Sequence, residues 1–279
     1  MHPDRIATLT PHQDINEILV QLAGGLADIL NDRLVGYYLT GSLTYGDFER
    51  GSSDIDYLVV MEAPVTTAQR QALVDLHGDV GRQYPEWRER IEGSYVTRDM
   101  LPNVRPPAQG RPYINQGAFW APDPPYGNEW LLNLYVLREC GIALIGPEPR
   151  ESIGPVTIGD VREASKRDLI EGWLPKADDP TAFADSHLQA YVTLTLCRIL
   201  HRAAHDGVAS KRVASTWVKE TYGEPWKSLV ERAEHWSHGE EMGSNAEVRD
   251  FIRFTARHLD SEAPCSTHSD YVGADQNRP

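Results

Sequence analysis

Residues 34 to 60 read LVGYYLTGSLTYGDFERGSSDIDYLVV, and this stretch decides the fold. A β-compatible run ends in the turn Gly41-Ser42, and an Asp-x-Asp opens a second apolar run twelve residues after Ser42. Alternate side chains of a strand share a face, so Asp54 and Asp56 point the same way. Paired carboxylates suit Mg²⁺, and a glycine turn lets the backbone approach a phosphate closely. The stretch predicts a site where Mg²⁺ meets a nucleoside phosphate.

A third carboxylate is needed if this site is catalytic, because two metals, or a metal and a base, require more oxygen ligands than one pair provides. Glu92 is the candidate, since it lies in the β-compatible run 90–96 that could form a strand beside the Asp-x-Asp strand. Glu86 and Glu89 belong to a polar stretch, for which a solvated surface is the simpler interpretation.

The whole chain has 279 residues, 41% of them apolar, which is enough for two cores. We expect an α+β N-terminal domain over residues 1–156, with a mixed sheet flanked by helices. An all-α helical bundle should follow over 157–260, with its first helix running from Ile158 to Trp173, and the polar residues 261–279 should be disordered. The N-terminal domain should also contain a long irregular excursion from Leu101 to Tyr126, where prolines are frequent.

The formal charge of −14 argues against a polyanionic partner, because binding nucleic acid requires several Lys or Arg contacts to phosphate. An acidic surface instead attracts a cationic small molecule. The longest apolar runs are too short to span a membrane, and the first residues lack the features of a signal peptide. We therefore expect a cytoplasmic protein without membrane contact; a monomer is favoured, although no residue pattern determines the oligomeric state.

The cysteines Cys140, Cys197 and Cys265 are odd in number and widely separated. This spacing supports neither a disulfide framework nor a zinc site. His201 and His205 stand four apart on a predicted helix, but Arg202 replaces the glutamate that would follow the first His in a zinc protease.

The chain resembles the bacterial aminoglycoside adenylyltransferases of the streptomycin and spectinomycin type, within the polymerase-beta-like nucleotidyltransferase superfamily. The resemblance covers most of the chain. Four segments carry it: GS…SDIDYLVV, RIEGSYV, ECGIALIGPEP and LTLCRILHRAAHDGVASKRVASTW.

This resemblance implies transfer of AMP from ATP to a hydroxyl of an aminoglycoside or aminocyclitol, with Mg²⁺ as cofactor and pyrophosphate as the second product. It implies that Asp54, Asp56 and Glu92 gather the metal and that Glu92 is the catalytic base. The ATP phosphates would be bound by the turn, by a serine before the Asp-x-Asp and by two cations of the helical domain: Gly41, Ser42, Ser53, Arg198 and Lys211.

For the drug, the resemblance implies tryptophans and acidic residues between the domains. Trp173 and Asp178 match the streptomycin-side determinants, and Trp120 matches the loop tryptophan if a gap is allowed. An ungapped alignment from Arg198 places Leu188 where an aspartate is expected, so Asp185 is assigned that role.

Two rival functions remain open from the residues. The chain could adenylylate a protein or another small metabolite, or it could be a non-catalytic nucleotide-binding relative. Retention of all three carboxylates argues against the second rival, because a binding module needs no base.

Overall fold

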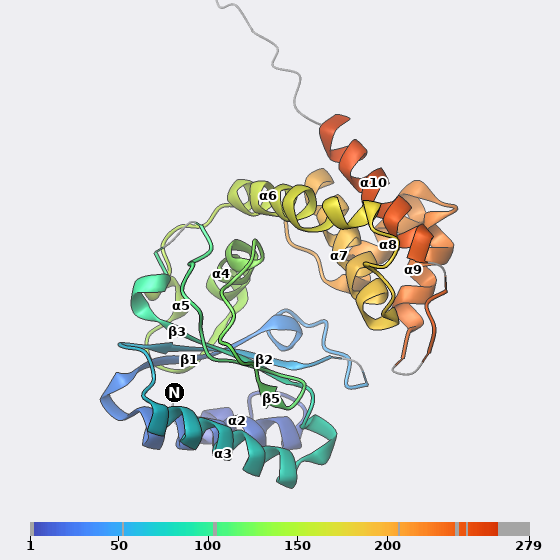
Figure 1. Cartoon of the computed structure of the whole chain (residues 1–279). Helices are drawn as coiled ribbons and strands as arrows, with labels where there is room; N and C mark the ends of the chain where they lie inside the picture. The colour runs from blue at the N-terminus through green and yellow to red at the C-terminus, as the bar shows by residue number, and fades with distance from the viewer. Residues whose placement is uncertain are drawn as a thin grey trace, which may run out of the picture.

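The computed structural model describes residues 3–261 except positions 52, 103, 104, 206, 238, 239 and 244. Within that range a six-stranded sheet is covered by helices, and a group of helices follows it (Figure 1). The expected α+β domain and helical C-terminal part are therefore confirmed. The predicted disordered tail covers residues 261–279; Ser261 is the last residue of a helix, and positions 262–279 lie outside the described residues.

The strands are β1 Leu34–Thr40, β2 Ile55–Met61, β3 Ile91–Thr97, β4 Tyr113–Asn115, β5 Ala118–Phe119 and β6 Ile142–Ile145. The helices of the first half are α1 Pro3–Ile6, α2 Gln13–Leu30, α3 Thr67–Gln83, α4 Trp130–Cys140 and α5 Pro149–Ser152. Those of the second half are α6 Ile158–Arg167, α7 Ser186–Ala204, α8 Lys211–Tyr222, α9 Trp226–His235 and α10 Asn245–Ser261.

The sheet has the order β5-β4-β3-β2-β1-β6. Strand β2 pairs antiparallel with β1 and parallel with β3, so the sheet is mixed. The parallel pair requires a crossover, which α3 provides. Thr66 begins that helix with a capping box, in which its hydroxyl accepts the Gln69 backbone N–H.

Helices cover both faces of the sheet. Figure 1 shows α2 and α3 on one side and α4 on the other. The first face buries large apolar side chains of α2 such as Leu19 and Leu22 against Tyr57 and Val59 of β2. The second face packs Leu58 and Val60 of β2 in one cluster with α4. Because both faces of β2 are buried, the strand itself is held firmly where the Asp-x-Asp begins.

Helix α6 belongs to both halves of the molecule. Its Ala164 is buried in the cluster that also contains Leu134 and Leu137 of α4, and Arg162 donates to the Arg202 carbonyl of α7 at 2.8 Å. The second half has its own core around α7, α8, α9 and α10. No helix within the described ranges is long and apolar enough to cross a membrane.

Two local expectations were wrong. The excursion from Leu101 to Tyr126 is not irregular throughout, because β4 and β5 form an antiparallel pair inside it and extend the sheet. The helix predicted to run to Trp173 changes at Asp168 into a π-helical segment, Asp168–Trp173. Such segments are rare and occur often at functional sites.

Candidate active site

The three predicted carboxylates meet at one end of the central strands. In the parallel β2–β3 pair Asp56 lies opposite Glu92, and Asp54 directly precedes β2. Asp54 is the most accessible of the three, with a side chain 46% exposed. The register therefore confirms the expected placement of Glu92 on the strand beside the Asp-x-Asp.

Burial and neighbouring negative charge disfavour ionisation of both strand carboxylates. Burial raises the pKa of Asp56 well above its ordinary value, and the charges of Glu92 and Asp54 raise it further. Burial also raises the pKa of Glu92, while a hydrogen bond from Tyr113 acts in the opposite direction. Crowded negative charge of this kind favours a bound cation.

The donor set fits Mg²⁺. Among the described residues, no group of three or more His, Cys, Asp and Glu side chains is arranged to hold an ion by itself. Mg²⁺ does not need such a group, because it binds through one or two carboxylates, several waters and substrate phosphates. Asp54 and Asp56 can supply the carboxylates, with Glu92 beside them.

The Gly41-Ser42 turn lies directly against this cluster. Gly41 has φ +68°, and the turn closes with the Thr44 N–H donating to the Gly41 carbonyl at 3.0 Å. A Cβ on Gly41 would overlap the carboxylate of Asp56. Only glycine allows both this left-handed conformation and this close approach.

Ser53 is fixed by the loop that precedes Asp54. Its hydroxyl oxygen accepts the Glu49 backbone N–H at 2.9 Å, which leaves its O–H free to donate. Arg90 closes the same loop by donating to the backbone carbonyls of Arg50, at 2.7 Å, and Ser53. Sequence reasoning missed Arg90, whose Nε also lies 3.9 Å from Asp54 Oδ1.

The positive charge of the site comes from the helical half. Lys211 is the first residue of α8. Its pKa is lowered overall, because desolvation and the charge of Arg198 outweigh the opposite effect of the three carboxylates. Lys211 is nevertheless exposed to solvent, as expected where many protein atoms surround an open site. Nε of Arg198, on α7, is buried without a hydrogen-bond partner. Arg198 thus has one guanidinium donor without a protein partner among the described residues.

An ion pair ties the two halves together next to these groups. Arg212 Nη2 lies 2.8 Å from Asp47 Oδ1. Asp47 follows the Gly41-Ser42 turn, and its N–H donates to the Ser42 carbonyl at 3.3 Å. The pair therefore links the start of α8, which carries Lys211, to the glycine turn.

The tryptophans proposed for drug binding lie in different settings. Trp120 is 48% exposed, and its ring meets the Tyr113 ring edge-on at 5.2 Å. Trp173 is half-buried and donates through Nε1 to Asp168 Oδ2 at 2.9 Å. Trp120 is therefore linked to Glu92 through Tyr113, whereas Trp173 packs on the helical core.

The two acidic residues proposed for the drug both have local partners. Asp178 has an 85% exposed side chain and an ion pair with Arg253 at 3.0 Å. Asp185 is the N-cap of α7, where its carboxylate accepts the backbone N–H groups of His187, at 3.3 Å, and Leu188, at 3.1 Å. A role for either residue in binding a drug stays a prediction.

Sequence reasoning also missed Tyr113 and Tyr191, which lie near Glu92, and Asp168, the partner of Trp173. Tyr113 binds Glu92, and only recognition of the short strand β4 could have found it. Tyr191 is 42% exposed on α7. Its pKa is raised because many protein atoms surround the ring although part of it stays in contact with solvent, and the charge of Arg198 opposes this change. The pKa of Asp168 is raised by burial, and its partner Trp173 opposes that change.

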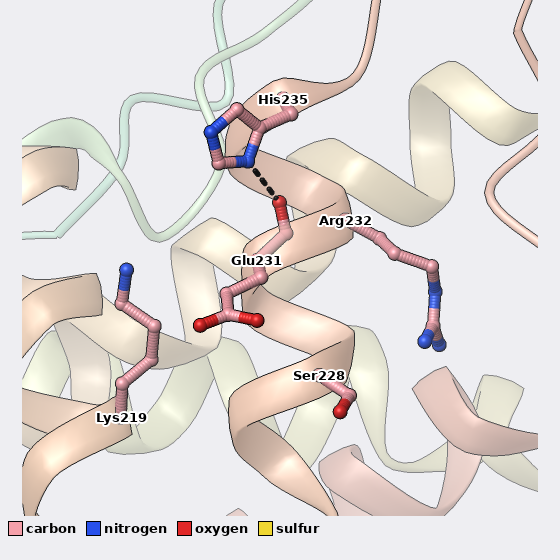
Figure 2. Close-up of a pocket in the computed structure, with 5 residues that line it drawn as sticks. All are labelled: Lys219, Ser228, Glu231, Arg232 and His235. Carbon is pink, nitrogen blue, oxygen red and sulfur yellow. Dashed lines mark hydrogen bonds between the residues drawn. The ribbon is translucent and has the colours of Figure 1, made fainter.

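A separate surface cavity of about 490 Å³ is not part of this site (Figure 2). It is lined by residues of α8 and α9, and Lys219 lies two turns beyond Lys211. The lysine and the arginine that line it already form ion pairs, Lys219 with Glu234 at 2.5 Å and Arg232 with Glu247 at 2.5 Å. The chemistry is therefore concentrated at the carboxylates.

Comparison with known domain families matches both halves of the chain. Residues 22–103 match the nucleotidyltransferase domain, and residues 153–261 match the C-terminal domain of aminoglycoside adenylyltransferase. The first match contains Gly41, Asp54, Asp56 and Glu92, and the second contains both cations. The carboxylate cluster thus lies within a domain of nucleotidyl-transferring enzymes.

Similar curated proteins span nearly the whole length. Aminoglycoside (3'') (9) adenylyltransferases of Shigella flexneri and Escherichia coli are each 24% identical, with 86% of this chain and 93% of the relative covered. The crystal structure of spectinomycin adenyltransferase AAD(9) from Enterococcus faecialis with ATP and spectinomycin has the same fold. Its TM-score is 0.68 at 19% identity, covering 88% of this chain and 98% of that one.

Proposed function

This chain is a nucleotidyltransferase whose second half is the C-terminal domain of aminoglycoside adenylyltransferases, and on that premise we propose that it transfers AMP from Mg-ATP to a hydroxyl of streptomycin or spectinomycin, releasing pyrophosphate. The observation that supports this proposal best is the opposition of charges at the site. Asp54, Asp56 and Glu92 on the sheet face Lys211 and Arg198 of the helical half.

In the proposed complex the ATP phosphates lie between the two halves. The Gly41-Ser42 turn and Ser53 bind from the sheet side, and Arg198 and Lys211 bind from the other. Lys211 begins a twelve-residue helix, so the free N–H groups of that helix end add to the attraction. Mg²⁺, held by Asp54 and Asp56, would neutralise charge on the attacking and leaving oxygens.

The protein's own groups then perform three tasks. The turn and the two cations orient the triphosphate so that pyrophosphate leaves in line with the incoming hydroxyl. Glu92 takes the proton of that hydroxyl as its oxygen attacks the α-phosphorus. Lys211 and Arg198 stabilise the charge that develops on the pyrophosphate.

We propose a cationic acceptor for two reasons. The curated relatives are named for aminoglycosides, and the solved neighbour contains spectinomycin. The net charge of −14 also favours ammonium groups over nucleic acid. Trp120, Trp173, Asp178 and Asp185 are the proposed drug contacts, and carboxylates give the strong hydrogen bonds that ammonium groups require.

The decisive experiment is a pyrophosphate-release assay with Mg-ATP and streptomycin, spectinomycin or a 4,6-linked aminoglycoside. We expect turnover with at least one of the first two drugs. Mass spectrometry should then find one AMP on the drug. If no drug causes pyrophosphate release and mass spectrometry finds AMP on a protein after incubation with ATP and lysate, the proposed drug acceptor is wrong and the acceptor is a protein.

Glu92→Gln tests the assigned base in the same assay. We expect transfer to be lost while calorimetry still detects ATP binding, because glutamine preserves shape but cannot accept the proton. If the variant instead weakened ATP binding and kept turnover, Glu92 would be a metal ligand rather than the base.

A further inference from the structure

Glu92 is held by a side chain of the neighbouring strand. The Tyr113 hydroxyl donates to Glu92 Oε1 at 2.6 Å. In the antiparallel β3–β4 pair Tyr113 lies opposite Ser94, so Glu92 is its diagonal neighbour on the same face, a spacing that an aromatic side chain can bridge. Hydrogen bonds to an ionised carboxylate are short and strong, which fits this distance.

The tyrosine is itself fixed from several sides. Asn115, two residues along β4 and on the same face, donates through Nδ2 to the Tyr113 hydroxyl at 2.9 Å. The Arg111 guanidinium lies 4.9 Å from the Tyr113 ring centroid, and the Trp120 ring meets it edge-on. The Trp120 backbone N–H also donates to the Tyr113 backbone carbonyl at 2.9 Å. Asn115 therefore directs the hydroxyl proton of Tyr113 toward Glu92.

We propose that Tyr113 is the positioning residue for Glu92, and that Asn115 acts through Tyr113. This inference rests on the proposed function, in which Glu92 is the base. The carboxylate has two oxygens, and Tyr113 occupies Oε1. The rotation of the group is thereby fixed, and Oε2 is the oxygen left to receive the proton of the acceptor hydroxyl.

Tyr113→Phe removes the hydrogen bond and keeps the ring. We expect kcat for AMP transfer to fall by about ten- to a hundredfold, the range for a lost hydrogen bond to a charged group. The KM values for ATP and acceptor should stay within about twofold, because Tyr113 does not bind either substrate. Asn115→Ala should lower kcat in the same direction but less.

Tyr84→Phe is the matched control. The Tyr84 hydroxyl also donates to a carboxylate, Glu17 Oε2 at 3.0 Å, on α2 and away from the site. This variant should keep wild-type kcat, and thermal melts should show all variants folded. An unchanged kcat in Tyr113→Phe, or a raised acceptor KM with unchanged kcat, would overturn the positioning role.

A double variant separates positioning from general structural damage. In the Glu92→Gln background, Tyr113→Phe should lower the residual rate no further, because it acts only through Glu92. Additive losses would contradict the proposal. Crystal structures give a readout without turnover: Glu92 should adopt one rotamer in the wild type and a different or mixed one in Tyr113→Phe.

The two proposals fail in different ways. A wild-type enzyme that transfers AMP to no acceptor overturns the proposed function. An active wild type in which Tyr113→Phe leaves kcat unchanged overturns the positioning role alone.

Discussion

Gly41→Ala should separate backbone strain from damage to the reacting groups. Gly41 has φ +68°, and a left-handed conformation costs an alanine about 1–2 kcal/mol. The new methyl group would also meet the Asp56 carboxylate. Because Asp56 lies on a strand buried on both faces, its side chain has to rotate away from the position that we assign to Mg²⁺.

Two magnitudes follow from this geometry. Urea denaturation should show about 1–2 kcal/mol less stability in Gly41→Ala, from the strain. The initial rate of pyrophosphate release should fall by about a hundredfold, since a misplacement of about 1 Å in a reacting group has that effect.

Gly223→Ala is the control for strain alone. Gly223 ends α8 with φ +60°, and a Cβ there would meet nothing within 4 Å. It should also lose stability, because φ +60° with ψ −148° is a backbone conformation essentially restricted to glycine, and it should keep its rate. If Gly41→Ala retained as much activity as Gly223→Ala, AMP transfer would not depend on the close approach of Gly41 to the Asp56 carboxylate, and the role that we assign to the turn would be wrong.

Three more predictions concern the carboxylates, the domain ion pair and the core. Asp54→Asn and Asp56→Asn should lose AMP transfer with unchanged circular dichroism; near-normal turnover in either would refute the assigned site. Arg212→Ala should raise the KM for ATP no more than about fivefold, the range for an exposed ion pair, and the effect should vanish in high salt; a salt-independent loss would exclude the ion pair as its cause. Burial lowers the pKa of His77 to about 3, against 6.5 in the unfolded chain, so only the unfolded chain takes up this proton between those values. Stability should therefore fall by about 1.4 kcal/mol for each unit by which the pH is lowered from 6.5 to 3. His77→Gln should show a shallower slope in acid denaturation, and an equal slope would contradict the assignment.

The central strands and the carboxylates could be predicted because their signals are local. The period-two pattern around Asp54 and Asp56 determines which side chains share a face. Glu92 was predictable for the same reason, since its own strand is regular.

The contacts around these residues could not be predicted, because they depend on distant pairing. Three-residue β4 carries too weak a pattern to distinguish it from the surrounding proline-rich loop, so Tyr113 was missed. Asp185 shows another limit: the resemblance assigns it a drug contact, its carboxylate accepts the backbone N–H groups of His187 and Leu188, and its role toward a drug stays a prediction. The sequence alone does not tell whether such an aspartate serves as a helix N-cap, as a ligand contact or as both.

The packing of α6 on α4 has a practical consequence for anyone who expresses the two halves separately. A cut after residue 156 would remove Ala164 from the cluster that contains Leu134 and Leu137. The uncovered apolar face of α4 would then promote aggregation. A soluble N-terminal fragment should therefore extend through Arg167, the last residue of α6.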